Sequence, residues 1–425
     1  MFSNKKSYVF AAMLLSTLCS TQVAIADIFL YYETAVLGGI INRPVSIDIV
    51  TDADMFAYQK YDGNWQDGFT PIETLPDGKK HYRVEQKNGK YGVAMYCGAN
   101  KHAFLFQLTT YESRYVKFEC NTDNTKEYKI SGTLTDSTAS PDALAVAMDV
   151  QYEIVSNNGD AYSLTVPQGK RDLLASSLKL VNNKVVPTKF YIQRDIMVDS
   201  DISKKDIVFT TSNSTVPQGY NFSSASGTEA ESFLISKNGT HFRSSIDGKW
   251  YIPPQNKLID GDFFTYYAEH SSNKTQMLEM YNAKNIARSD KNIDISYISP
   301  FNGVTYDNTD TFAGLNYKAS AASQKFSMYL LFMQKQDSFD NMYFEVFLSS
   351  GWLNGSTSYT IPNLTALTTF QSAWIGNGAD SVNAAAMMSS VSLEEIMRSD
   401  SMFRHKLEIF MVPGAKYEIA NKKIF

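Results

Sequence analysis

Apolar and polar residues alternate at every second position along many short stretches of this chain. A period of two is typical of β-strands that bury one face and leave the other in water. The stretch 45–50 is a clear case, because it reads Val-Ser-Ile-Asp-Ile-Val. Turn-forming pairs separate such stretches, and we expect Asn88 and Gly89 to close a hairpin because a type I′ turn needs positive φ at both positions. Helical periodicity is scarce, so the pattern predicts an all-β protein of tandem sandwiches.

Two of the predicted strands, 90–97 and 115–120, end in a cysteine. Because side chains alternate along a strand, each cysteine shares a face with the apolar residues before it, and we assign that face to the core. An even number of cysteines in an oxidising compartment predicts a disulfide, here between Cys97 and Cys120. Closing a loop of this length would stabilise the first domain by roughly 3 kcal/mol. Two free buried thiols are the alternative.

The first residues have the three parts of a secretory signal peptide. Two lysines form a short positive region, residues 8–18 are an apolar run, and residues 24–26 read Ala-Ile-Ala, a small-x-small cleavage site. We therefore expect residues 1–26 to be removed, so that the mature chain begins at Asp27.

The expected location follows from this N-terminus. Lipoprotein processing at Cys19 is the alternative to signal-peptide cleavage, and it is disfavoured because Leu18 stands where a small residue is expected. No later stretch has the roughly 18 uninterrupted apolar residues that a spanning helix needs, so we expect no transmembrane span in the mature chain. We expect an exported protein with a periplasmic, outer-membrane-associated or extracellular location.

A chain of 425 residues is too long for a single hydrophobic core. We expect four β-rich regions after the signal peptide: an Ig-like β-sandwich at 27–123, a second β-sandwich at 124–212, a β-sandwich-like region at 216–296 and a β-rich C-terminal region at 297–425. The last region has the one helix that we expect, at about 393–402, where Ser392 and Glu395 form a capping box.

The first region has about as many short predicted strands as an immunoglobulin-like sandwich. A true immunoglobulin domain places a tryptophan between its two cysteines, whereas Trp65 precedes both Cys97 and Cys120 here. The prediction is therefore an Ig-like architecture without membership of that family.

The second region has the string Tyr-Ser-Leu-Thr-Val-Pro-Gln-Gly-Lys-Arg-Asp-Leu-Leu-Ala at 162–175. This string resembles the strand–Pro–Gly–strand core of the carboxypeptidase regulatory-like, prealbumin-type sandwiches found in many secreted bacterial proteins. Residues 189–198 and 207–209 resemble the closing strands of that unit. The resemblance covers roughly 80 residues, and it implies a folding and spacing module without catalytic activity.

The sequence has a mildly negative net charge of −5 and no cluster of lysines and arginines longer than a pair. Nucleic-acid binding needs basic patches that neutralise phosphates. We therefore expect no nucleic-acid partner.

Catalytic and metal-binding motifs are mostly missing from the sequence. It has neither the Gly-x-Ser-x-Gly nucleophile elbow nor the His-Glu-x-x-His zinc motif. A lone Ser-x-x-Lys match at 271–274 lacks its companion motifs, and we interpret it as a polar turn. Aspartate pairs at 199–201 and 260–262 could offer oxygens to a surface Ca²⁺, but loop aspartates are usually turn formers. We assign no catalytic residue, no metal ligand and no cofactor.

Three tryptophans, Trp250, Trp352 and Trp374, are the candidate ligand-binding aromatics. Aromatic faces pack well against the C–H surfaces of sugars, which would suit a glycan ligand. The competing interpretation, which we favour, places these rings in sandwich cores, where a chain rich in Tyr and Phe buries most of its aromatics.

These observations predict a non-catalytic structural or adhesive protein that presents a binding surface to an unknown protein or glycan. A carbohydrate-binding protein is the first alternative, and it predicts exposed tryptophan rings. A secreted hydrolase of unknown class is the second, and it predicts a pocket that gathers at least two of His241, His270, Glu269, Asp260 and Asp262. The adhesive prediction expects instead an exposed apolar patch or a free sheet edge.

Overall fold

The structure is a computed structural model, and it describes the following residues: 44–60, 63–76, 78–120, 126–224, 229–272, 275–283, 288–293, 304–307, 309–315, 325–336, 341–365, 367, 379–398 and 415–424. The predicted signal peptide, 1–26, and Trp374 lie outside the described residues.

Strands make up nearly all regular structure in the described ranges, so the all-β prediction is confirmed. The described helices are short: α3 (Ser350–Leu353), α4 (Leu393–Arg398) and the 3-10 turns η1 (Gly98–Asn100) and η2 (Gln255–Lys257).

Helix α4 begins at the predicted capping box. The Oγ of Ser392 accepts a hydrogen bond from the Glu395 N–H at 3.2 Å, and the Glu395 carboxylate accepts one from the Ser392 N–H at 2.9 Å. The hydrogen bonds from the Ser392 hydroxyl and N–H hold the pKa of Glu395 below its usual value. The capping box is confirmed, because each residue satisfies an amide that the first helical turn leaves open.

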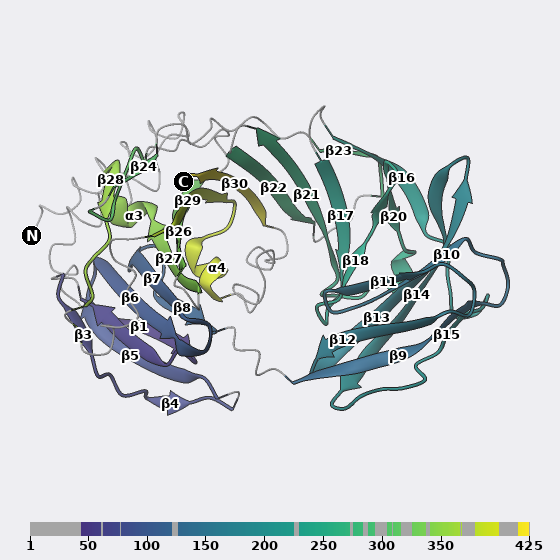
Figure 1. Cartoon of the computed structure of the whole chain (residues 1–425), viewed down its shortest axis with the longest axis horizontal. Coiled ribbons are helices and arrows are strands. Elements are labelled where there is room, and N and C mark those ends of the chain that lie inside the picture. Colours follow the sequence, from purple (N-terminus) through teal and green to yellow (C-terminus); the bar gives the residue numbers. More distant parts are fainter. Residues whose placement is uncertain are drawn as a thin grey trace, which may run out of the picture.

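The strands gather into two lobes that one long sheet connects (Figure 1). The terminal lobe contains residues 44–120 and 304–424, which come from both ends of the described chain, and the middle lobe contains residues 126–293. The hydrophobic clusters follow this division, since each cluster draws its residues from one lobe.

The long sheet has twelve strands in the order β18-β17-β21-β22-β30-β29-β26-β27-β7-β6-β2-β3. These strands are β18 (His241–Arg243), β17 (Glu229–Ile235), β21 (Phe263–Ser272), β22 (Thr275–Ala283), β30 (Lys416–Lys423), β29 (Ser381–Ser389), β26 (Lys325–Gln336), β27 (Asn341–Ser349), β7 (His102–Thr109), β6 (Lys90–Cys97), β2 (Met55–Gln59) and β3 (Trp65–Asp67). The lobes meet where β22 pairs with β30.

Two smaller sheets cover the two faces of the long sheet in the terminal lobe. One has the order β4-β5-β1-β8 and consists of β4 (Glu73–Thr74), β5 (Lys80–Lys87), β1 (Pro44–Thr51) and β8 (Tyr115–Phe118). The other consists of β24 (Thr305–Tyr306), β25 (Thr311–Ala313) and β28 (Ser358–Thr360). On β7, Phe104 and Phe106 therefore pack toward the first sheet, whereas Leu105 packs toward the second. A strand buried on both faces explains why this stretch is apolar without alternation.

The middle lobe also has three layers. Its central sheet has the order β11-β10-β13-β14 and consists of β11 (Gln151–Val155), β10 (Ala143–Met148), β13 (Gly169–Val181) and β14 (Lys184–Val198). One face carries the sheet of β12 (Ala161–Pro167), β9 (Glu127–Asp136) and β15 (Ile207–Phe209). The other face carries the middle-lobe end of the long sheet and the sheet of β19 (Ser245–Ile246), β20 (Lys249–Ile252), β16 (Gln218–Ser224) and β23 (Lys291–Ile293). Leu173 and Leu174, neighbours on β13, accordingly belong to different cores.

Segments that are far apart in the sequence lie side by side in the terminal lobe. Strand β27 pairs in parallel with β7, so residues from the predicted regions 27–123 and 297–425 share one sheet and two hydrophobic cores. The Glu112 carboxylate fastens the same two segments, because it accepts hydrogen bonds from the Gly351 N–H at 2.6 Å and from the Ser350 hydroxyl at 3.1 Å. The first and last predicted regions, which are far apart in the sequence, are therefore neighbours in space.

The pair Asn88 and Gly89 does not close a hairpin, so that prediction is wrong. Strand β5 before it pairs with β1 and β4, and strand β6 after it pairs with β2 and β7 in the long sheet. Gly89 has a φ of 144°, and its carbonyl accepts a hydrogen bond from the Thr110 N–H at 3.0 Å. Its permissive backbone serves a corner between two sheets, which local sequence does not distinguish from a hairpin turn.

Candidate functional site

The two cysteines are joined as a disulfide inside the terminal lobe. Cys97 ends β6 and Cys120 follows β8, and their Cα atoms lie 5.5 Å apart, a separation that suits a disulfide. Both side chains are buried in the cluster that also contains Val93 and Phe118, as the alternation along the two stretches requires. The bond thus ties the long sheet to the sheet that covers it.

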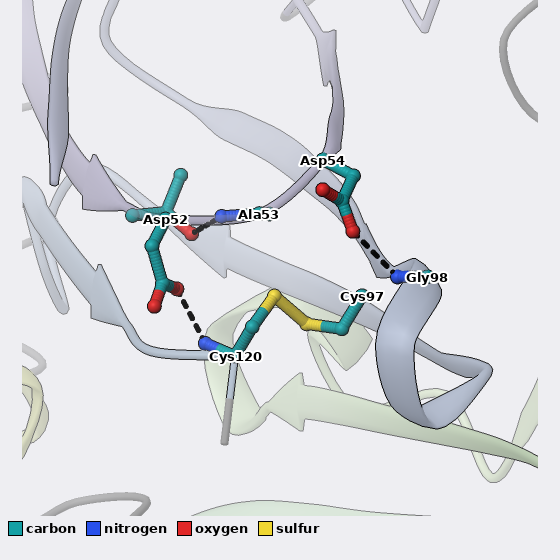
Figure 2. Close-up of a disulfide and its surroundings, with 7 residues drawn as sticks. Asp52, Ala53, Asp54, Cys97, Gly98 and Cys120 are labelled. Carbon is teal, nitrogen blue, oxygen red and sulfur yellow. Dashed lines mark hydrogen bonds between the residues drawn. A yellow bond between two sulfur atoms is a disulfide. The ribbon is translucent and has the colours of Figure 1, made fainter. Parts of the chain in front are cut away.

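Two aspartates between β1 and β2 hold the backbone beside the disulfide (Figure 2). The Asp52 carboxylate accepts a hydrogen bond from the Cys120 N–H, and the Asp54 carboxylate accepts one from the Gly98 N–H at 2.6 Å. Burial raises the pKa of Asp52, and the hydrogen bond from Cys120 opposes that rise. These groups satisfy one another, so the disulfide region is a structural joint.

The predicted ligand-binding tryptophans are not gathered on one exposed surface. Trp250 is 0% exposed, and its indole N–H donates a hydrogen bond to the Ser289 carbonyl at 3.1 Å, so no face of its ring is open to a ligand. Trp352 is partly buried, with the Lys90 ammonium 5.4 Å from its ring centroid. Trp374 lies outside the described residues.

Among the acids and histidines proposed for a hydrolase, His241 and Glu269 lie far apart. His241 pairs with Ile235 and Glu269 pairs with Glu229, so these two residues lie at opposite ends of β17. Asp262 is buried, whereas Asp260 is exposed. The side chain of His270 lies outside what the structure describes.

Asp262 belongs to a buried ionic cluster, which we call the Arg194 joint. The Arg194 guanidinium donates to the Asp172 carboxylate at 2.9 Å and to both oxygens of Asp262 at 2.8 and 2.6 Å. It also donates to the Lys257 carbonyl at 3.0 Å. Asn238 donates to the second oxygen of Asp172 at 2.8 Å. The joint thereby fastens β13 and β14 to the turn that follows β17 and to the segment that precedes β21.

Backbone amides complete the Arg194 joint. The Asp195 N–H donates to Asp172 at 2.9 Å, and the Lys237 and Ile259 N–H groups donate to Asp262 at 2.9 and 3.0 Å. Burial by itself raises the pKa of Asp172, but the hydrogen bonds from Asn238, the Asp195 N–H and Arg194 outweigh it and hold that pKa below its usual value. Carboxylates whose lone pairs are engaged in this way have no free oxygen for a substrate, so this cluster is structural.

A second buried carboxylate lies nearer the middle of the same hairpin. Asp136 on β9 forms an ion pair with Lys189 on β14, and its other oxygen accepts a hydrogen bond from the Ser177 hydroxyl at 2.8 Å. The N–H groups of Thr138 and Ala139 also donate to it, at 3.0 and 3.1 Å. Asp136 is therefore another fully engaged group that holds two layers together.

An open groove lies at the far end of the β13–β14 hairpin. It has a volume of about 650 Å³, and its lining combines aliphatic side chains with a charged rim. The residues used below are Val181, Lys184, Val186, Val216, Pro217, Lys249 and Tyr251, and we call this surface the hairpin groove.

The hairpin groove exists because β13 and β14 extend beyond their neighbour. Strand β10 pairs with β13 only as far as Leu178, whereas residues 179–181 pair with 184–186 alone. Asn182 and Asn183 form the turn, with φ values of 50° and 60°, the two successive left-handed residues of a type I′ turn. The projecting end leaves Val181 47% exposed, and the loop beside it leaves Val216 72% exposed.

The rim of the hairpin groove carries two exposed lysines, Lys184 and Lys249, and neither has an ion-pair partner within the described part of the chain. Asp247, also on the rim, is engaged, because its carboxylate accepts a hydrogen bond from the Val185 N–H at 2.5 Å. The groove therefore offers apolar area flanked by positive charge.

Sequence reasoning missed the hairpin groove, although a signal was present. The sequence pattern indicates strands at 162–175 and 189–198 and leaves the residues between them unassigned. Asn182 and Asn183 lie between two runs rich in branched apolar residues, which is the pattern of a two-residue hairpin. The position of Val216 beside that hairpin could not have been predicted, because the contact joins segments from different layers.

The described residues contain no helix that is both long and apolar enough to cross a membrane. Within the same residues, no three side chains from His, Cys, Asp or Glu gather in the manner of a metal site.

No family model matches the chain, and no curated protein matches it in sequence. Among solved structures, the chain is similar to a candidate adhesin from Bacteroides ovatus, with 7% sequence identity over 35% of this chain and 74% of that one. The TM-score of this match is 0.15, which is too low to define a common fold.

Proposed function

We propose that this chain is an exported, non-catalytic binding protein that holds a partner protein in the hairpin groove. The observation that carries this proposal is a contrast within the middle lobe. Its buried carboxylates are engaged by protein donors, whereas the hairpin groove exposes aliphatic side chains and lysines that have no ion-pair partner among the described residues. Exposed apolar area with a charged rim is typical of interaction surfaces.

A protein partner suits the hairpin groove better than a glycan does. Sugars stack on exposed aromatic faces, and the aromatic residue of this groove, Tyr251, is only 8% exposed. Val181, Val186 and Val216 offer aliphatic contacts, which fit branched apolar side chains. The rim lysines favour a carboxylate next to that apolar segment, so an acidic residue of the partner would lie beside Lys184 or Lys249.

The shape of the molecule supports a role in presentation. The first and last described strands, β1 and β30, both belong to the terminal lobe, whereas the strands around the hairpin groove belong to the middle lobe (Figure 1). Strands from both ends of the described chain thus form a base, and the central part of the chain forms a head that carries the groove.

An adhesive role also requires a chain that works outside the cytosol. Disulfides form and persist in oxidising compartments, and the joined Cys97 and Cys120 fit such a location. We propose that the protein acts in the periplasm, at the outer membrane or outside the cell, as the predicted signal peptide implies. We also propose that the chain divides near residues 124 and 297, where it passes from the terminal lobe to the middle lobe and back.

The proposal is tested by binding of the mature chain to a panel of immobilised extracellular and envelope proteins and to a glycan array. We expect retention on one or more proteins, and we expect Val216→Glu to weaken it at least about tenfold, because a carboxylate would replace an apolar contact. Val208→Glu is the matched control, since Val208 is an exposed valine of the same lobe, on β15.

Equal retention of Val216→Glu and the unmodified chain would refute binding in the hairpin groove. Retention on glycans alone would favour the carbohydrate-binding alternative. Thermal unfolding of both variants should match that of the unmodified chain, because both side chains are exposed.

A further inference from the structure

The central sheet of the middle lobe ends in a short edge strand. Strand β11 (Gln151–Val155) pairs with β10 on one side, and no other strand of the described chain pairs with it. An edge strand presents unpaired backbone groups that can template another chain, and proteins usually protect such edges with proline, lysine or a covering segment. The sequence of β11, Gln-Tyr-Glu-Ile-Val, contains neither proline nor lysine.

The backbone groups of Tyr152 and Ile154 point away from β10. At the other edge of the sheet, Phe190 of β14 exchanges two backbone hydrogen bonds with Thr215, at 2.7 and 2.9 Å, so its N–H and C=O point outward. The direction in which the backbone N–H and C=O groups point alternates from one residue to the next along each strand. Phe190 pairs with Ser176, Ser176 pairs with Ala145, and Ala145 pairs with Ile154, so the direction can be followed from β14 to β11. On β11, residues 151, 153 and 155 therefore bond to β10, and residues 152 and 154 face the open side.

The side chains of these two outward residues are exposed and apolar. Tyr152 is 40% exposed and Ile154 is 55% exposed, and they share one face of the strand. Glu153 lies between them on the other face, where one oxygen accepts a hydrogen bond from the Ser163 N–H at 2.6 Å. A strand added here would meet two open backbone positions, two apolar side chains and one carboxylate.

We propose that the free edge of β11 binds an extended segment of a partner protein, which adds to the central sheet as a fifth, antiparallel strand. The segment has the pattern apolar–basic–apolar: its apolar side chains pack beside Tyr152 and Ile154, and its basic side chain lies opposite Glu153. This surface is separate from the hairpin groove, and the inference does not depend on the function proposed for that groove.

The Glu153 carboxylate disfavours a second copy of this chain as the partner that binds this edge. Two copies of β11 paired antiparallel over all five residues would place Glu153 directly opposite Glu153, and like charges in that position destabilise a strand pair. A partner with a lysine or arginine at this position gains an ion pair instead. The edge thus favours a different chain over self-association.

The test uses two synthetic fluorescein-labelled peptides, Thr-Val-Lys-Val-Thr and Thr-Val-Glu-Val-Thr, and measures fluorescence anisotropy with the mature chain at physiological salt. We expect the lysine peptide to bind at least about fivefold more tightly than the glutamate peptide. The lysine would lie opposite the Glu153 carboxylate, whereas the glutamate would place two negative charges side by side. Glu153→Lys should reverse this preference, an outcome that a misfolded variant cannot produce.

Ile154→Pro blocks the edge without removing a bond from the sheet, because the N–H of Ile154 points outward. We expect this variant to lose the lysine peptide by about tenfold or more, whereas Val216→Glu, which alters the hairpin groove, should bind it as the unmodified chain does. The proposal is overturned if neither peptide binds, if both bind equally, or if Ile154→Pro leaves binding unchanged.

Discussion

The two ends of the β13–β14 hairpin use polar residues in opposite ways. At one end, the half-buried Arg194 binds the buried carboxylates of Asp172 and Asp262, which also accept hydrogen bonds from backbone amides. At the other end, Lys184 is exposed without an ion-pair partner within the described residues, beside the exposed Val181. The same pair of strands therefore fastens two layers at its base and leaves an open surface at its tip.

This difference separates structural charges from available ones. A buried charge is tolerated only when partners replace the water that it loses, so the groups of the Arg194 joint have no capacity left for a ligand. An exposed lysine keeps its hydration and exchanges it for a partner at little cost. A charged residue therefore indicates a binding site only when its side chain is exposed and is not already bound by other groups of the protein.

The largest difference in stability is expected when one cation is removed from each end of β14. Arg194→Met should lower the free energy of unfolding by about 3–5 kcal/mol, because it leaves two buried carboxylates unpaired. Lys184→Met also replaces a cation with methionine, but at the exposed tip of the hairpin. It should change the free energy of unfolding by less than about 0.5 kcal/mol. Urea unfolding monitored by circular dichroism measures both. Similar losses for the two variants would show that the cation at the tip contributes as much to stability as the cation at the base.

A cation between the two ends should give an intermediate effect. Lys189→Met leaves Asp136 buried, but the Ser177 hydroxyl and the two backbone amides still bind that carboxylate. We expect a loss of about 2 kcal/mol in the free energy of unfolding, since one charged hydrogen-bond partner is removed. The same urea titration measures it, and a loss as large as that of Arg194→Met would mean that position along the hairpin does not set the cost.

Acid should destabilise the protein through the buried carboxylates beside the β13–β14 hairpin. The pKa values of Asp136 and Asp172 lie below the ordinary value of 3.8, since hydrogen bonds and cations stabilise the charged forms against burial. A carboxyl whose folded-state pKa is lowered contributes stability above the unfolded-state pKa and loses it as pH falls through the folded-state pKa. The urea midpoint should therefore be constant from pH 7 to 5 and fall below about pH 4. A midpoint unchanged down to pH 2.5 would contradict the ionised joint.

The smallest effect is expected at the turn. Asn183 has a φ of 60°, a left-handed conformation that glycine adopts without steric cost. Asn183→Gly should therefore change the free energy of unfolding by only about 0.3 kcal/mol, with a gain in turn geometry partly offset by the entropy of glycine. Differential scanning calorimetry measures the shift, and a large destabilisation would show that the Asn183 side chain contacts something essential.

The local features of this protein could be predicted from its sequence. Alternation placed Ile47 and Ile49 in the core and Asp48 on the outer face of β1, and it put Cys97 and Cys120 on faces that meet. The capping box at Ser392 was equally readable, because its partners are three residues apart. Each of these features depends on a repeat of two or on a contact within one turn, so a short window of sequence is enough.

The pairing of the strands and the open surfaces could not be predicted, because they depend on contacts between distant segments. An apolar strand such as β7 fits many neighbours, and its parallel partner β27 comes from more than two hundred residues later in the chain. Asn88 and Gly89 form a corner instead of a hairpin, and Arg194 meets Asp262 only after two sheets have packed. These contacts depend on the free energy of the whole assembled core, and no local pattern records it.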